Sequence, residues 1–154
     1  MANTTPNIGQ QCKLYYNDAG SFSDAMSSSN WKEMSDVQDL TLGDESDKAD
    51  AFTRATRIKR YLLGLTDHPI SFNSLWDPSD VGFAAFLAAR VAKTILPVMI
   101  LDGDKDEAGS TGMKLDVFVS KCDRQQPLGD ASMADIELCV GYSSNLPTPV
   151  TATT

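Results

Sequence analysis

The sequence is poor in histidine, which limits the chemistry it can perform. His68 is the single histidine among 154 residues, so sites built from several histidines are excluded. A serine or cysteine nucleophile with a histidine base would have to use this residue. It precedes Pro69 in a turn-like stretch, and Asp67 is its nearest acid. We therefore predict that the chain is not an enzyme and has no catalytic residues.

Cysteine is also scarce, and the chain lacks a long hydrophobic run. Cys12, Cys122 and Cys139 are odd in number and show no CxxC spacing, which argues against a disulfide framework or a thiolate zinc site. No window contains the roughly 18 to 20 uninterrupted apolar residues of a membrane span. The start, MANTTPNIGQQ, lacks the basic and apolar regions of a signal peptide. We expect reduced thiols, no membrane partner and no secretion by a standard signal.

Positive charge is in short supply. Thirteen Lys and Arg face twenty-one Asp and Glu, which leaves a formal net charge of -8 and argues against tight binding of nucleic acid through its phosphates. The basic cluster Arg54, Arg57, Lys59 and Arg60 lacks the aromatic and polar neighbours that read bases. We expect it to pair with the six acids between residues 36 and 50, within the chain or across a subunit contact.

The sequence has no glycine-rich phosphate loop and no complete metal motif. Asp102, Asp104 and Asp106 have the spacing of a calcium loop, but Glu107 stands where the turn needs glycine. Met113 stands where that motif needs a bidentate glutamate. The stretch is predicted to be a solvated acidic loop, with a weak cation site as the alternative, and we expect no cofactor.

Alternation of apolar and polar residues predicts several strands. The second stretch fits a strand only if a bulge between Val37 and Leu40 switches its apolar face. Pro97 lacks a backbone donor and indicates an edge or bulge position. The third and fourth stretches are predicted to form a hairpin. The expected strands are 12–17, 31–42, 54–63, 68–75, 94–101, 112–120 and 135–142.

One helix is clearly signalled after Trp76. Asp77 is a suitable cap, and Pro78 fits the first helical position because a helix leaves that N–H unpaired. An apolar stripe at helical spacing, interrupted by a single arginine, is expected to lie against a sheet. The stripe consists of Phe83, Phe86, Leu87, Arg90 and Val91.

These elements predict a mainly β (α+β) fold, an antiparallel β-sandwich or small barrel of about seven strands with one flanking α-helix. Residues 1–10 are expected to be an N-terminal arm and residues 144–154 an extended C-terminal tail. Between them, 11–143 would form a single domain containing a long, mostly charged loop at 43–56.

The layout of residues 10–143 resembles the tail tube (major tail) proteins of tailed bacteriophages and phage-like particles. The resemblance rests on the order of a few segments around the long charged loop and the single helix. These are Lys13-Leu14-Tyr15-Tyr16, Trp31 through Val37-Gln38-Asp39-Leu40-Thr41-Leu42, Arg54-Ala55-Thr56-Arg57, Trp76-Asp77-Pro78-Ser79-Asp80 and Gln126-Pro127-Leu128-Gly129-Asp130.

The resemblance implies a structural virion protein that self-assembles into hexameric rings stacked into a tail tube. The partners would be further copies of the chain, other tail proteins and DNA, which passes through the ejection channel as non-specifically conducted cargo. No small-molecule substrate is implied, and assembly would take place in the host bacterial cytoplasm. The long loop would contact a neighbouring ring, and the expected subunit contacts are Asp44, Glu45, Asp47, Lys48, Asp50, Arg54 and Arg57.

A second hypothesis fits the same composition. The chain could be a monomeric cytosolic β-module that binds a ligand against Trp31 or Trp76, or a cation at residues 102–106. A tube subunit should form oligomers or polymers and ignore small ligands. A binding module should stay monomeric and show a melting temperature that rises with its ligand.

Overall fold

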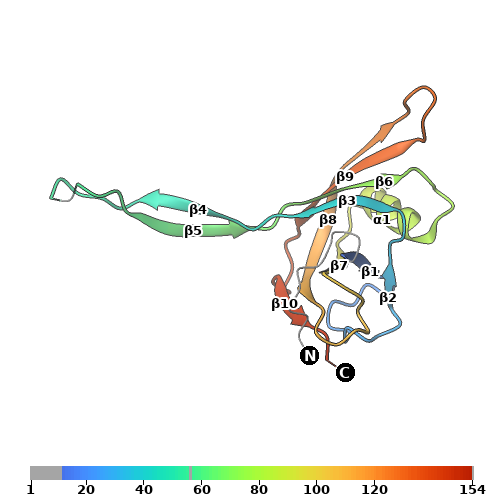
Figure 1. Ribbon diagram of the computed structural model, residues 1–154, viewed down its shortest axis with the longest axis horizontal. Coiled ribbons are helices and arrows are strands. Elements are labelled where there is room, and N and C mark those ends of the chain that lie inside the picture. Colours follow the sequence, from blue (N-terminus) through green and yellow to red (C-terminus); the bar gives the residue numbers. More distant parts are fainter. Residues whose placement is uncertain (1–11, 56, 154) are drawn as a thin grey trace.

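The computed structural model describes residues 12–55 and 57–153 (Figure 1). Within them the strand pairings are antiparallel and a single helix is present, which confirms the predicted mainly β class. The expected N-terminal arm, 1–10, lies outside the described residues. The elements are β1 (Lys13–Asn17), β2 (Trp31–Glu33), β3 (Val37–Leu42), β4 (Glu45–Asp50), β5 (Tyr61–Asp67), β6 (Ile70–Leu75), α1 (Val81–Ala92), β7 (Leu96–Leu101), β8 (Thr111–Gln125), β9 (Met133–Val140) and β10 (Thr148–Thr151).

Eight of these strands form one sheet. Seven follow the order β2-β1-β7-β8-β9-β6-β3, and β10 pairs with β8. No pairing in the described part of the chain joins β2 to β3, so this sheet is open and is not a closed barrel. The remaining strands, β4 and β5, form a separate two-stranded sheet that projects far from the rest (Figure 1).

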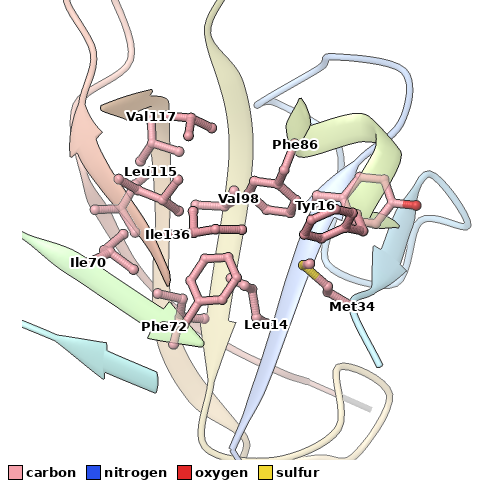
Figure 2. Close-up of a cluster of buried hydrophobic side chains, with 14 of the residues drawn as sticks. Leu14, Tyr16, Met34, Ile70, Phe72, Phe86, Val98, Leu115, Val117 and Ile136 are labelled. Atoms are coloured by element: carbon pink, nitrogen blue, oxygen red, sulfur yellow. The ribbon is translucent and has the colours of Figure 1, made fainter. Parts of the chain in front are cut away.

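The main core lies between one face of the sheet and α1. Figure 2 shows Phe86 of the helix in one cluster with side chains from β1, β6, β7 and β8. Its ring packs edge-to-face on Phe72 and Tyr16, with centroids 5.7 and 6.1 Å away. Each fully buried side chain of this kind stabilises the fold by about 1.5–3 kcal/mol. The inward faces of β6, β8 and β9 are those that the alternation predicted.

A second apolar cluster covers the opposite face of β1 and β7. It contains Tyr15, Trp31, Met99 and Leu101, so β7 is buried on both faces. Burial on both faces explains why this strand is a continuous apolar run in the sequence. Pro97 pairs with Asp116 of β8, whereas the register with β1 extends only from residue 98 to 101. The proline therefore occupies a position where β1 needs no donor, although the strand itself is central.

The helix begins later than predicted. Asp80, not Asp77, is the N-cap, and its carboxylate accepts a hydrogen bond from the Phe83 amide at 3.0 Å. Asp77 instead accepts one from the Ser79 amide in the preceding turn. The buried face also differs, because Val91 is 83% exposed while Ala89 is buried. The helix buries the predicted Phe83 and Phe86 together with the small residues Gly82 and Ala89, and its side chain at position 91 faces outward.

Arg90 has a specific role within the predicted stripe. Its guanidinium Nη1 donates a hydrogen bond to the Val119 carbonyl of β8, at 3.1 Å. That carbonyl follows the part of β8 that pairs with β7, whose register ends at Val117. Arg90 thus provides a hydrogen-bond donor to a carbonyl on the part of β8 that no longer pairs with β7.

Two sequence predictions about residues 43–75 were wrong. The expected loop at 43–56 contains strand β4, and the expected hairpin between 54–63 and 68–75 does not form. Instead β5 pairs with β4, while β6 pairs with β3 and β9. β4 has few β-forming residues, so its extended conformation depends on the ladder with β5 and not on its own propensity.

Besides β4, the structure has two strands more than predicted. One arises because a predicted strand is divided in two, and the other is β10. The stretch 31–42 divides into β2 and β3, and the register shift between Val37 and Leu40 confirms the predicted bulge. In the expected tail at 144–154, β10 pairs with the start of β8, and Ala152 is buried. The domain boundaries themselves stay a prediction.

Candidate subunit interface

The β4–β5 hairpin is the most exposed element of the molecule. Every residue of both strands is exposed, and the hairpin leaves the body at one end of the long axis (Figure 1). Its base is held to the sheet by the Gly43 amide, which donates to the Pro69 carbonyl at 2.7 Å. The His68 ring also contacts the Gly43 carbonyl through Nδ1, at 3.2 Å. The rest of the hairpin has no layer of the described chain packed over it.

Large apolar side chains lie along this unsupported hairpin. Leu62, Leu63 and Leu65 of β5 are 64%, 82% and 83% exposed, and Phe52 and Ile58 near the turn are exposed as well. Exposed apolar side chains gathered on a projecting ribbon are typical of surfaces that take part in contacts with other proteins. The hairpin therefore has the character of an assembly contact.

The exposure of these leucines was not predicted, because residue 62 was expected in a strand paired with 68–75. The signal was the run Leu62-Leu63-Gly64-Leu65, in which apolar residues do not alternate with polar ones. A two-stranded ribbon with apolar side chains on both faces cannot bury both of them against one body.

The seven residues predicted to form subunit contacts all lie on or beside this hairpin. Asp44 precedes β4, four of them belong to β4, and Arg54 and Arg57 lie near the turn. All seven are exposed. The Lys48 ammonium lies 5.2 Å from the centre of the Tyr61 ring on the facing strand. Their role as contacts stays a prediction.

The charges of the hairpin are separated along its length. Acids dominate β4 and the residue before it, whereas Arg54, Arg57, Lys59 and Arg60 surround the turn; we call these four residues the basic tip. In the described residues, the ion pairs of the protein include none from the basic tip. The basic residues were predicted to pair with acids either of the same chain or of a neighbouring subunit. Among the described residues, the pairing within the chain is not formed.

The predicted calcium-like loop uses its carboxylates internally. The Asp102 carboxylate accepts from the Thr111 amide and hydroxyl at 2.7 and 3.0 Å. Asp104 accepts from the Asp106 amide and from the Lys13 ammonium, both at 3.0 Å, and these bonds lower its carboxyl pKa. Across residues 12–55 and 57–153, no group of three or more His, Cys, Asp or Glu side chains is placed to hold a metal ion.

The aromatic candidates of the ligand-binding hypothesis are occupied by packing. Trp31 is 2% exposed and belongs to the second apolar cluster. Lys114 lies 5.4 Å from its ring centre, and burial lowers the pKa of this lysine. Trp76 packs edge-to-face on Phe83 at 5.2 Å, and the Arg124 guanidinium lies 4.6 Å from its ring centre.

The cysteines are free thiols, as expected for a protein without a disulfide framework. Cys12 and Cys139 are exposed, and Cys122 is half-buried on β8. Burial raises the pKa of the Cys122 thiol, which keeps it protonated and unreactive near neutral pH.

A groove of about 640 Å³ opens between the start of β1 and β3. The half-buried Val37 and Leu40 contribute apolar surface to it, while Glu33 and Asp39 contribute exposed carboxylates. We call this feature the acidic groove. The single helix of the described residues is too short to cross a membrane.

No family model matches the chain, and no curated protein matches it either. Solved structures do share its fold. A chain in the tail of an empty gene transfer agent particle, refined with C6 symmetry, aligns at a TM-score of 0.74 with 7% identity, over 96% of this chain and all of that one. The SPP1 tail tube aligns at 0.69 with 17% identity, over 95% of this chain and 80% of that one.

A third solved structure extends the likeness to injection systems. The sheath/tube terminator of an extracellular contractile injection system aligns at a TM-score of 0.66 with 8% identity, over 97% of this chain and all of that one. The chain therefore has the fold of tail tube proteins along nearly its whole length, as the resemblance in its sequence implied.

Proposed function

We propose that this chain is a non-enzymatic structural subunit that assembles, six copies to a ring, into a stacked tail tube. The observation that carries the proposal is the hairpin β4–β5, whose exposed leucines and charges find no partner layer within the described chain. The likeness to solved tail structures supports it, because one of them was refined with sixfold symmetry.

Burial of the hairpin by neighbouring copies provides the driving force. Each leucine transferred from water into a packed contact contributes up to about 1.5–3 kcal/mol. Isolated hairpins of this length are marginal in water, so the ribbon gains order from the contact as well. The apolar side chains would supply affinity, and the charges of β4 and the basic tip would set the register between copies.

The tube would conduct DNA without holding it. With a net charge of -8, the subunit offers few cations for phosphate groups, and carboxylates facing a channel repel a polyanion. Other tail proteins would cap and extend the tube at its ends. In this proposal the protein is located in the virion tail after assembly in the host bacterial cytoplasm.

Replacement of Arg54 and Arg57 together by Glu tests the proposal. We expect wild-type protein at high concentration to form rings or tubes with a central channel, seen by negative-stain electron microscopy and as high mass in light scattering. The double variant should remain a folded monomer of 16.7 kDa, because like charges would then meet across the contact.

A matched control reverses two exposed lysines away from the hairpin, Lys32 and Lys93, to Glu. This control has the same total charge as the test variant, so normal assembly would show that position matters and not net charge. A wild-type chain that stays monomeric and melts higher with a small ligand would contradict the tube and favour the binding module.

A further inference from the structure

The basic tip and the acidic groove lie on different parts of the molecule. The hairpin starts after β3 and runs away from the body, so the tip forms the far end of the long axis (Figure 1). The groove opens on the body, beside the beginning of β3. Strand β4 alone carries the chain about 20 Å outward, at 3.3 Å per residue. The tip of a chain therefore points away from its own groove.

The groove carries net negative charge that is available to a partner. Its lysine, Lys13, is already engaged, with its ammonium 3.0 Å from Asp104 and 3.4 Å from Glu33. Glu33 still has 46% of its side chain exposed, and Asp39 is exposed on β3. A cationic group entering the groove would meet more acid than base.

The groove also offers apolar surface and an open strand edge. The half-buried side chains of Val37 and Leu40 contribute to its lining, and β3 ends the strand order, so its outer edge has no strand partner in the described residues. An occupant with both positive charge and apolar side chains would complement the carboxylates and the apolar lining. The hairpin turn has this composition, because Phe52 and Ile58 are exposed beside the basic tip.

We propose that the acidic groove of one copy receives the basic tip of a neighbouring copy. This inference rests on the proposed tube function and adds the receiving surface, which the hairpin alone does not identify. Arginine guanidinium groups can bind the carboxylates of Glu33 and Asp39 in a paired, two-bond geometry. Phe52 and Ile58 would lie on the apolar part of the groove.

The contact has a consequence for symmetry. Because tip and groove are different surfaces, each copy uses its tip toward one neighbour and its groove toward another. A head-to-tail contact of this kind closes into a ring or continues as a helix, whereas a self-complementary contact stops at a dimer. The geometry of a single chain is thus suited to an extended assembly.

The acids of β4 are the competing receptor for a neighbour's basic tip. They lie on a fully exposed, projecting ribbon, and Lys48 stands among them. The acidic groove combines exposed carboxylates with the half-buried side chains of Val37 and Leu40 on one concave surface, so a tip bound there can make ionic and apolar contacts together. This difference favours the groove, and the experiment below separates the two.

The test uses two variants of the full chain. The tip variant carries Arg54→Glu and Arg57→Glu, and the groove variant carries Glu33→Lys and Asp39→Lys. Alone, each should need more than about tenfold higher concentration to assemble, since like charges face each other. Mixed, they should assemble again, because the acidic tip of one fits the basic groove of the other. Circular dichroism melts check that each variant is folded.

A control variant, Asp18→Lys with Asp130→Lys, has the same charge change as the groove variant, at exposed sites away from the groove. It should assemble like wild type. Normal assembly of the groove variant, together with failure of the tip variant, would overturn the groove contact and leave the tube proposal intact. A complex in the mixture that never forms rings would support the groove contact and overturn the tube.

Discussion

The side chain of Asp116 on β8 binds the segment that connects β9 to β10. Its carboxylate Oδ2 accepts hydrogen bonds from the Ser143 hydroxyl at 2.7 Å and from the side-chain amide of Asn145 at 2.9 Å. The side chain is buried, and its Oδ1 has no hydrogen-bond partner in the described residues. A buried carboxylate with one oxygen unpaired is costly, and the two hydrogen bonds of Oδ2 offset part of that cost.

Asp116→Ala should therefore destabilise the protein. The change leaves the side-chain amide of Asn145 without this acceptor and the Ser143 hydroxyl with only its longer bond to the Asn145 carbonyl, at 3.3 Å. Loss of charge-assisted bonds of this kind costs about 1–3 kcal/mol. Asp116→Asn keeps one acceptor oxygen and should cost less. Urea unfolding of the two variants at neutral pH measures the difference. Equal stabilities would contradict a role for the carboxylate in holding 141–147.

Asp24 organises the loop that follows β1. Its Oδ2 accepts from the side-chain amides of Asn30 at 2.8 Å and Asn17 at 3.0 Å. These bonds favour the charged carboxylate and lower the pKa of Asp24 below its ordinary value. A carboxyl group with a lower pKa in the folded state contributes stability above its unfolded pKa of about 3.9.

That stability is lost as the pH falls through the folded pKa of Asp24. The melting temperature of the wild type should thus drop from about pH 5 downward, with Asp77 and Asp104 contributing in the same direction. Asp24→Asn cannot titrate and should show a shallower drop, although it melts lower at pH 6. Melts at several pH values between about 3 and 6 provide the comparison. Parallel curves for the two proteins would be evidence against this account.

At the scale of the element, the helix depends on its cap. Asp80 satisfies the Phe83 amide at the start of α1, and removal of such a cap costs about 0.5–2 kcal/mol. We expect Asp80→Ala to lose about 1 kcal/mol in urea unfolding. Asp77→Ala is the matched control, since Asp77 bonds only within the preceding turn. An equal loss in both variants would assign the effect to the turn and not to the cap.

The strands that alternate cleanly were predictable from the sequence. The buried positions on β8 and β9, such as Leu115, Val117 and Ile136, match the predicted faces because one side of each strand meets the core. The hairpin β4–β5 was not predictable in the same way. No core selects a face there, so its pattern carried no periodic signal and strand pairing was assigned to the wrong neighbour.

At the scale of the molecule, the body and the hairpin are expected to behave separately. Replacing residues 44–67 by a short glycine linker between Gly43 and His68 removes no residue of either apolar cluster. The melting temperature should therefore change by only a few degrees. Assembly should disappear, because the apolar contacts and the basic tip are gone. Light scattering of the shortened chain at high concentration makes the check, and persistent rings would contradict the role of the hairpin.

Several properties follow from the residues without any tertiary information. Composition excluded multi-histidine sites and argued against a disulfide framework and a phosphate-binding surface, because each needs residue types that the chain has in small supply. Alternation and the helix signals predicted a mainly β domain with one helix. These properties are local or compositional, so a linear sequence carries them.

The partner of each strand, and the surfaces left for other copies, were decided only in three dimensions. β5 pairs with β4, β10 returns to β8, and Lys13 is drawn to Asp104, 91 positions away. Such choices depend on which edges and charges are still unsatisfied once the core has formed. The same process leaves the leucines of β5 exposed and places the basic tip far from the acidic groove.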